Sequence, residues 1–218
     1  MHIEAIDAKL ANIDWSSATA IQVTAEPILR ELAARPDTLS ELIRCGRENA
    51  LTRSMWEHHP LRDKLVLLTD AVYRLRIHVF LPGHYEQPHD HRWPYCTFIL
   101  RGRYRHVLYQ AHAAPAVGAG CVPTGLEECL VRDEPRGSCY ALAGGLFHAI
   151  EADPYTVSLV VRGAPTRDRF TKFDASTGEG RWEYGAAKES EATRQRKQMS
   201  EEHAESVVRS LHDLRVLS

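Results

Sequence analysis

Alternation of apolar and polar residues dominates the middle of the chain. Apolar side chains occupy every second position from residue 73 to residue 81. A period of two is typical of a strand with one buried face, and Pro82-Gly83 marks the end of this strand. More strand-like runs cover residues 95–101, 103–109, 138–142, 147–151 and 156–162, and Gly102 separates the first two at hairpin distance. Several short strands with turn signals between them predict an antiparallel sandwich or a small barrel.

The first 60 residues have helical spacing instead. Pro27 suits the first position of a helix. Thr38 and Glu41 have capping-box spacing, and Gly46 is expected to end that helix. These short amphipathic helices are expected to cover one side of a sheet, with a partner surface as the alternative. Their apolar positions are Ile3, Ile6, Leu10, Ile13, Ile28, Leu29 and Leu32.

The remainder of the chain is more polar. Residues 110–136 begin as an Ala-, Gly- and Pro-rich loop, and residues 163–185 read as a polar extension over the barrel rim. A C-terminal helical face is expected either to dock on the barrel or to pair with another subunit. We therefore divide the chain into a helical segment packed on the barrel (1–63), the barrel (64–165), and a polar extension with a C-terminal amphipathic helix (166–218). The C-terminal apolar face consists of Ala204, Val207, Val208, Leu211 and Leu214.

Composition and charge restrict the class of protein. The 218 residues are 44% apolar and 26% charged, which is ordinary for a globular domain and indicates neither disorder nor a membrane protein. A net charge of −2 argues against nucleic acid as a partner. The start of the chain has no basic stretch followed by an apolar run, so no secretory signal is expected. Five cysteines without C-x2-C spacing suggest neither disulfides nor structural zinc, and a cytoplasmic location is expected.

Three histidines are the best candidates for chemistry. On a strand, His89 and His91 would share one face while Asp90 points away. His148 lies in a Gly-rich, strand-like frame and is the expected third ligand of a metal site. A single histidine on a strand is more often a surface or hydrogen-bonded core residue, so the argument depends on the three together.

Two separated motifs resemble those of the cupin superfamily. Gly83, His89, His91 and Gly102 match the first motif, in which Tyr95 takes the place of the usual Glu. Gly137, Gly145 and His148 match the second motif, with Ala143 and Ala152 in the Pro and Asn places. The resemblance implies a mainly β fold, the cupin double-stranded β-helix (jelly-roll) barrel with N-terminal helices and a C-terminal helix. It also implies a three-histidine metal site without the carboxylate, and by analogy a homodimer.

Imidazole ligands do not name the ion. They suit iron, zinc, copper, nickel and cobalt. Our first expectation is Fe(II), with Zn, Mn or Ni as alternatives. Phe98 and Leu100, if they face inward, would shield the site from water. Metal binding is expected to weaken as the histidines become protonated below a pH of about 6.5.

A narrower resemblance concerns the run PHDHRWPYCTFILRGRYRHVLY. This run is similar to the metal-binding strands of the cysteine dioxygenase (thiol dioxygenase) family and also resembles bacterial cupins of unassigned activity. Cys96 stands where that family commonly has a cysteine. In that family the cysteine can be cross-linked to a tyrosine, and Arg162 takes the place of that tyrosine in this chain. The resemblance implies Cys96 as a catalytic residue and Arg62 as the residue that binds the substrate carboxylate. A small buried apolar role for Cys96 and a surface charge role for Arg62 are the alternatives.

Further candidates come from the strands themselves. Alternation along residues 156–162 would let Arg162 direct its guanidinium into the cavity to bind a carboxylate, with a salt bridge at the rim as the alternative. Tyr95 is a candidate catalytic donor to a metal-bound ligand, and Tyr140 a candidate for substrate binding. Either tyrosine could instead satisfy a structural partner.

Three functions remain open from the sequence. The first is a mononuclear non-heme iron dioxygenase that acts with dioxygen on a small amino-acid-like carboxylate, a thiol such as cysteine first. The second is a redox-inert metal-dependent cupin, namely an isomerase, lyase or hydrolase. The third is a non-catalytic small-molecule-binding cupin.

Overall fold

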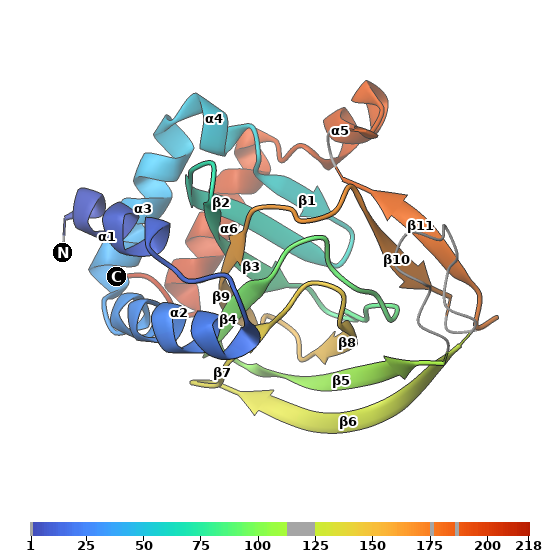
Figure 1. Ribbon diagram of the computed structural model, residues 1–218. Coiled ribbons are helices and arrows are strands. Elements are labelled where there is room, and N and C mark those ends of the chain that lie inside the picture. The colour runs from blue at the N-terminus through green and yellow to red at the C-terminus, as the bar shows by residue number, and fades with distance from the viewer. Residues whose placement is uncertain (1, 113–124, 175–176, 186–187) are drawn as a thin grey trace.

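The barrel consists of nine strands in two antiparallel sheets (Figure 1). The computed structural model describes residues 2–112, 125–174, 177–185 and 188–218. The strands are β1 (Glu57–His59), β2 (Arg62–Thr69), β3 (Tyr73–Phe80), β4 (Tyr95–Arg101), β5 (Arg103–Ala111), β6 (Leu126–Pro135), β7 (Cys139–Leu142), β8 (Phe147–Ala152) and β9 (Val157–Gly163). The larger sheet has the order β1-β2-β3-β9-β4-β7, and the smaller sheet has the order β6-β5-β8.

The segment between β3 and β4 completes the smaller sheet beside β8. Tyr85 forms a bridge to Glu151, and His89 forms a bridge to His148. The chain thus passes between the two sheets in the strand order of a jelly roll. The expected fold class, a mainly β cupin-type jelly roll with helices at both ends, is confirmed.

The larger sheet has one apolar and one polar face. Along β3, Leu75, Ile77 and Val79 belong to the main hydrophobic core, whereas Arg76 and His78 face the inside of the barrel. The main core therefore lies outside the barrel, between this sheet and the helices, and a smaller apolar cluster that includes Phe80 and Val160 lies inside the barrel. As a result, polar side chains can line the barrel interior without weakening the packed core.

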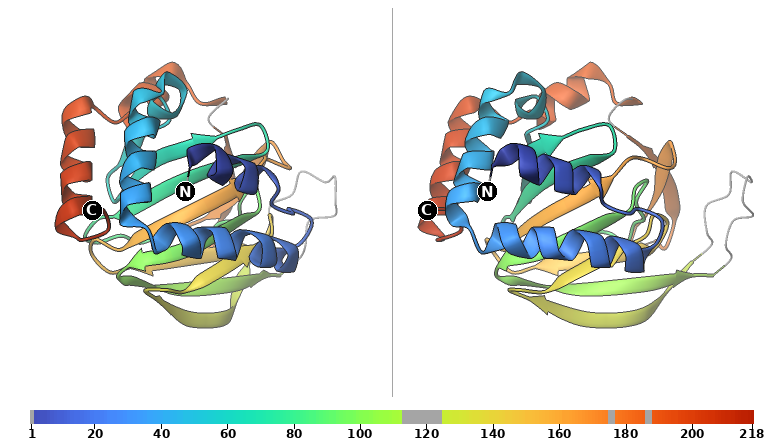
Figure 2. Two further views of the ribbon diagram at one scale, coloured as in Figure 1. Left: turned by 90° about the vertical axis from the view of Figure 1, so that its left-hand side faces the viewer. Right: turned by 60° about the vertical axis from the view of Figure 1, so that its left-hand side comes forward.

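Helices cover the outer face of the larger sheet (Figure 2). Helix α2 packs against β4 and β7, and α3 packs against β2. The described helices are α1 (Ile3–Ala11), α2 (Ala18–Ala33), α3 (Pro36–Glu48), α4 (Ala50–Arg53), α5 (Glu191–Lys197) and α6 (Glu201–Asp213). None of the helices in the described part of the chain is long and apolar enough to cross a membrane.

Three of the predicted helix boundaries are wrong. Pro27 lies inside α2, which begins earlier because the Ser17 hydroxyl caps it by accepting a hydrogen bond from the Ala20 N–H. Helix α3 begins at Pro36, so Thr38 lies within its first turn and does not cap it. Gly46 lies within α3 rather than at its end. A side chain there would lie 2.7 Å from the Val66 carbonyl oxygen, so glycine permits the close approach of α3 to β2.

The C-terminal helix docks within the chain. Ala204, Val207 and Leu211 of α6 are buried in the same core as the N-terminal helices. The buried Asp63 carboxylate of β2 contacts His203 of α6 at 2.9 Å and also pairs with His58. The predicted apolar face is therefore used for docking on the barrel assembly.

The polar extension contains a hairpin that the sequence did not indicate. Strands β10 (Arg169–Phe173) and β11 (Gly180–Tyr184) pair with each other next to the segment that carries His89. Asp90 accepts a hydrogen bond from the Thr171 N–H at 2.7 Å and pairs with Arg167 at 2.9 Å. This hairpin therefore fixes the segment between His89 and His91 from outside the barrel.

Gly102 does not form a hairpin between its flanking strands, contrary to expectation. β4 belongs to the larger sheet and β5 to the smaller one, so Gly102 is a corner between the sheets. Its φ is +74°, and a Cβ there would lie 2.3 Å from Thr156 Oγ1 and 2.9 Å from Thr156 Cα. Both the backbone conformation and the close approach of β9 require glycine.

We predict that Gly102→Ala destabilises the protein more than Gly137→Ala does. Gly137 has a φ of +89° but open space where a Cβ would stand, so its replacement measures backbone strain alone, about 1–2 kcal/mol. Overpacking against Thr156 should add about 1–3 kcal/mol for Gly102→Ala. Urea unfolding of both variants measures the difference, and equal losses would contradict this account of the corner.

Candidate metal centre

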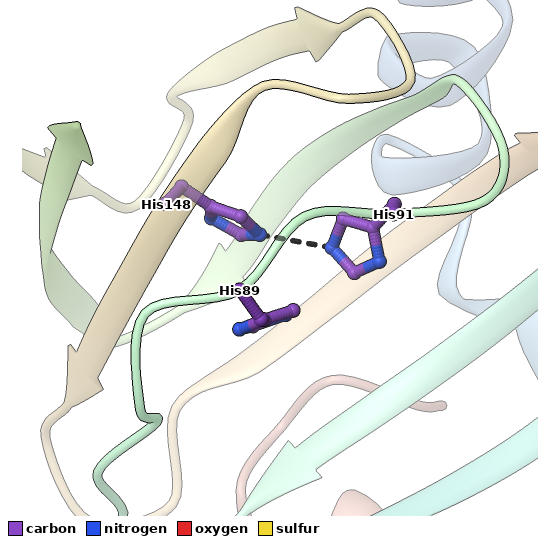
Figure 3. Close-up of side chains that lie close together, drawn as sticks. All are labelled: His89, His91 and His148. Atoms are coloured by element: carbon purple, nitrogen blue, oxygen red, sulfur yellow. Dashed lines mark hydrogen bonds between the residues drawn. The ribbon is translucent and has the colours of Figure 1, made fainter. Parts of the chain in front are cut away.

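Three imidazoles converge at one end of the barrel (Figure 3). His89 and His91 come from the segment before β4, and His148 comes from β8. One ring nitrogen of each lies within 4.8 Å of those of the other two. The Nε2 atoms of His91 and His148 are 2.8 Å apart. The predicted ligand set is therefore brought together by the fold.

Backbone hydrogen bonds hold the two segments in register. The His89 N–H donates to the His148 carbonyl at 2.9 Å, and the His148 N–H donates to the His89 carbonyl at 2.8 Å. The segment around His89 is not a regular strand, contrary to expectation, but this isolated bridge has the same effect. It places two ligands opposite each other although they are far apart in the sequence.

The outer ring nitrogens have partners that fix the tautomers. The Gln87 carbonyl is 2.9 Å from His89 Nδ1 and can only accept, so the proton is on Nδ1 and His89 Nε2 is free. His148 Nδ1 lies 3.1 Å from His106 Nε2, and His106 Nδ1 lies 3.5 Å from the Glu134 carboxylate. If the carboxylate accepts from His106, then His106 accepts from His148, and His148 Nε2 is free too.

Burial keeps these rings neutral. Removal from water lowers the pKa of His91 and His148 well below the usual range, and the neighbouring imidazoles add to this effect. The pKa of His89 is also lowered by burial, which the Glu86 carboxylate partly opposes. Neutral imidazole is the form that binds a metal ion, so the site is ready for one at neutral pH.

The spacing of the His91 and His148 nitrogens fits a divalent transition ion. Two nitrogens that each lie about 2.1 Å from one ion at a right angle are about 3 Å apart. The 2.8 Å separation of His91 Nε2 and His148 Nε2 is close to this value. Three neutral nitrogens suit iron, zinc, nickel or cobalt and do not select among them. The expected three-histidine site is therefore compatible with the geometry, and the ion is undefined.

Tyr95 lies beside the imidazoles. Its hydroxyl is 3.4 Å from His148 Nε2, in keeping with its place in the cupin motif where Glu is usual. Burial raises the pKa of Tyr95 well above its usual value, so the group stays a phenol that can donate a hydrogen bond. Tyr140 also lines the cavity, but its hydroxyl pairs with Tyr104 at 2.9 Å.

The cavity beside the histidines is small and rich in cations. Its volume is about 50 Å³, which is room for a few water-sized groups. Arg62 lines it and pairs with the half-buried Glu86, a partner that the expected carboxylate-binding role of Arg62 did not include. Arg76 lines it too and packs on the Trp93 ring, and its Nε is buried without a hydrogen-bond partner. Burial lowers the pKa of Arg76, with Arg74 as the next cause.

Cys96 lies on the wrong face for the role expected of it. It shares a face with Phe98 and Leu100, as predicted, but that face packs against α2 in the main core. Tyr95 and Thr97 line the cavity instead, because neighbouring residues of a strand point to opposite sides. The Cys139 thiol at 3.6 Å and burial raise the pKa of Cys96, which makes it an unreactive thiol. Neither Cys96 nor Phe98 nor Leu100 contacts the metal site.

Arg162 lies close to the cavity but does not line it. It is 8% exposed, and its guanidinium lies over the Trp93 ring, 4.6 Å from the ring centroid. Its Nη1 donates to the Gly163 carbonyl at 2.8 Å rather than reaching the histidines. Arg162 lines a second cavity with Arg74 and Arg92.

Three residues of the site escaped the sequence analysis. Arg76 lies on the predicted strand 73–81 and His106 on the predicted strand 103–109, but a polar residue on a strand carries no local sign of which face holds a ligand. Glu86 precedes His89 by three residues, and its carboxylate lies 3.9 Å from His89 Nε2. Its position three residues before His89 was the signal in the sequence that could have identified Glu86.

We predict that His106→Asn weakens metal binding about 10–100-fold, because it removes the partner that orients His148. Competition between the purified protein and a chelator for Zn²⁺ measures the dissociation constant. His112→Asn is the matched control, because His112 is an exposed histidine at the far end of the same strand pair. Equal affinity in the two variants would show that His106 does not position His148.

The lowered histidine pKa values predict a pH dependence of stability for the metal-free protein. Burial lowers the pKa of His78, His91 and His148, so the unfolded chain takes up protons near pH 6.5 and the folded chain does not. The free energy of unfolding should fall below pH 6.5 by up to about 1.4 kcal/mol per pH unit for each histidine.

Denaturant titrations between pH 5 and 7 measure this dependence. The carboxyl groups whose pKa is lowered, such as Glu57 and Glu86, act only near pH 4.5 and below, so they do not interfere. His78→Gln should reduce the dependence of the free energy of unfolding on pH by the contribution of one histidine. A constant free energy of unfolding between pH 5 and 6.5 would contradict the burial of neutral rings.

No family model matches the chain, and no curated protein matches its sequence. KdgF from Halomonas sp. is 16% identical over 52% of this chain and 87% of that chain, with a TM-score of 0.38. A variant of oxalate decarboxylase from Bacillus subtilis is 14% identical over 51% of this chain and 28% of that chain, with a TM-score of 0.38. A cupin superfamily protein from Desulfitobacterium hafniense is 10% identical over 49% of this chain and 81% of that chain, with a TM-score of 0.34. Likenesses this distant carry no argument about activity, and it is the strand order of the chain itself that gives it the cupin-type jelly-roll fold.

Proposed function

We propose that this protein is a metal-dependent enzyme that acts on a small carboxylate. The convergence of three neutral imidazoles, two of which line a small cavity, carries the proposal, together with an arginine on that cavity whose buried Nε has no hydrogen-bond partner. His89, His91 and His148 would hold one divalent ion through Nε2. Arg76 would bind the substrate carboxylate, because its charge has no carboxylate partner among the described residues.

The first candidate activity is that of an iron-dependent dioxygenase. Bound Fe(II) would supply dioxygen activation, and three protein ligands leave coordination positions for substrate and dioxygen. Tyr95 would donate a hydrogen bond to a ligand beside His148. An amino-acid-like thiol such as cysteine is the first substrate to test. Support for a thiol is limited to the sequence resemblance, since Cys96 faces away from the site.

The cavity itself contributes binding and exclusion of water. Phe80, Ile150 and Val160 line it together with the charged groups, so a bound substrate would be largely removed from solvent. Electrostatic interactions strengthen in such an environment, which favours an anionic substrate near Arg76. A volume of about 50 Å³ selects for a substrate of few non-hydrogen atoms.

Glu86 favours a second candidate, a redox-inert isomerase, lyase or hydrolase. This carboxylate is half-buried, lies near His89 and pairs with Arg62. The Arg62 charge lowers the pKa of Glu86 well below its usual value against the effect of burial, so the group is an ionised acceptor at neutral pH. It could accept a hydrogen bond from a substrate held at the cavity, with Zn, Mn or Ni supplying Lewis acidity.

The two candidates differ in their need for oxygen. Protein from iron-replete medium should contain iron in stoichiometric amount and consume oxygen when cysteine or a related thiol carboxylate is added. Conversion of a small carboxylate under strict anaerobiosis would favour the second candidate. Neither bound metal nor conversion of any small carboxylate in either condition would contradict the proposal.

Matched variants identify the residues responsible. His148→Ala should abolish metal binding and turnover, whereas His112→Ala should leave both unchanged. Arg76→Met should raise the KM for the carboxylate substrate at least about tenfold, because a charge-assisted hydrogen bond is lost. The exposed Arg105 serves as its control as Arg105→Met.

A further inference from the structure

A second cavity adjoins the metal centre without sharing a lining residue with it. Its volume is about 270 Å³, and it lies where the ends of β3 and β9 meet the segment before β4. Three arginines from these three segments line it. The lining residues are Asp70, Ala71, Tyr73, Arg74, Arg92, Arg162, Ala164 and Pro165.

Within the described residues, the hydrogen bonds of the three guanidinium groups go to neutral oxygens. Arg74 Nε is 3.4 Å from Thr69 Oγ1, and Arg162 Nη1 donates to the Gly163 carbonyl. Arg92 Nη1 is 3.4 Å from the carbonyl oxygens of residues 167 and 168. The Nε atoms of Arg92 and Arg162 are buried without a hydrogen-bond partner. Most of the donors of these groups are therefore unused.

No carboxylate in the described part of the chain pairs with Arg74, Arg92 or Arg162. Asp70 lines the cavity, but its Oδ1 accepts from the Ala71 N–H at 2.6 Å. The residues outside the described ranges include no Asp or Glu, so they cannot supply the missing charge.

This arrangement is costly for the folded protein. Arg74 and Arg162 lie directly opposite each other on β3 and β9, where like charges repel. Burial and the neighbouring Arg76, Arg74 and Arg92 lower the pKa of Arg162, but a guanidinium keeps its charge at neutral pH. Cation–π contacts with the Trp93 ring, at 4.6 Å for Arg162 and 5.2 Å for Arg92, offset only part of the cost. A bound anion would relieve the repulsion and use the free donors.

We propose that this cavity is a binding site for a phosphate group, either inorganic phosphate or a phosphate monoester. Guanidinium forks bind phosphate through paired N–H donors. Three cations around one cavity favour an anion with close to two negative charges, as phosphate has at neutral pH, over a carboxylate with one. The site does not depend on the function proposed above, because it shares no residue with the metal cavity.

Calorimetric titration of the full chain with inorganic phosphate tests this site. It should be performed on the metal-loaded protein and after removal of metal with a chelator. Phosphate should bind in both forms, and acetate at the same ionic strength should bind at least about tenfold more weakly. Arg74→Met and Arg162→Met should each weaken phosphate binding at least about tenfold. Arg74 is the half-buried member, so its variant keeps the test valid if Arg162→Met does not fold.

Two further variants decide where phosphate binds. Arg105→Met, an exposed arginine on a distant strand, should bind phosphate like the unmodified protein. Arg76→Met removes a cation from the metal cavity and should keep most of the phosphate affinity. Phosphate binding that is lost in Arg76→Met but unchanged in Arg74→Met, or that requires the metal, would overturn the proposal. A phosphate monoester that binds more tightly than inorganic phosphate would identify the source of the group.

Discussion

The pair of backbone hydrogen bonds between His89 and His148 is the contact on which the whole site depends. Through it, a segment that is not a regular strand takes the place of one beside β8. The rings of His89 and His148 then lie with their centroids 4.7 Å apart, and His91 follows two residues later. Asp90, between them, points away and is fixed by the β10–β11 hairpin. A shift of one residue in this bridge would send the imidazoles to opposite sides of the sheet.

The second organising feature is a sheet with its core on the outside. The apolar face of the larger sheet packs against helices from both ends of the chain, and this packing provides the main hydrophobic core. The barrel interior carries a second, smaller apolar cluster that includes Phe80, Ile150 and Val160. It holds histidines, buried tyrosines and a series of arginines whose charges are only partly balanced. Stability and site chemistry are therefore carried by opposite faces of the same strands.

The sequence was sufficient for six of the strands, namely β3, β4, β5, β7, β8 and β9, and for the metal ligands, because both depend on spacing. Period-two alternation located β3, and the two histidine motifs located the site. It was not sufficient for orientation. Alternation shows that Tyr95 and Cys96 point to opposite sides, but which side is the cavity depends on where α2 packs, and α2 lies far away in the sequence. The same limit explains why Arg76 was missed and why Arg162 was assigned to the wrong cavity.

X-ray absorption at the metal edge of the loaded protein tests the central claim most directly. We expect three imidazole nitrogens at about 2.0–2.2 Å from a single ion, with oxygen or further nitrogen ligands completing the coordination. The contribution from imidazole should fall by one ring in His89→Ala. A sulfur ligand, or fewer than three imidazoles in the unmodified protein, would contradict the three-histidine centre and the function built on it.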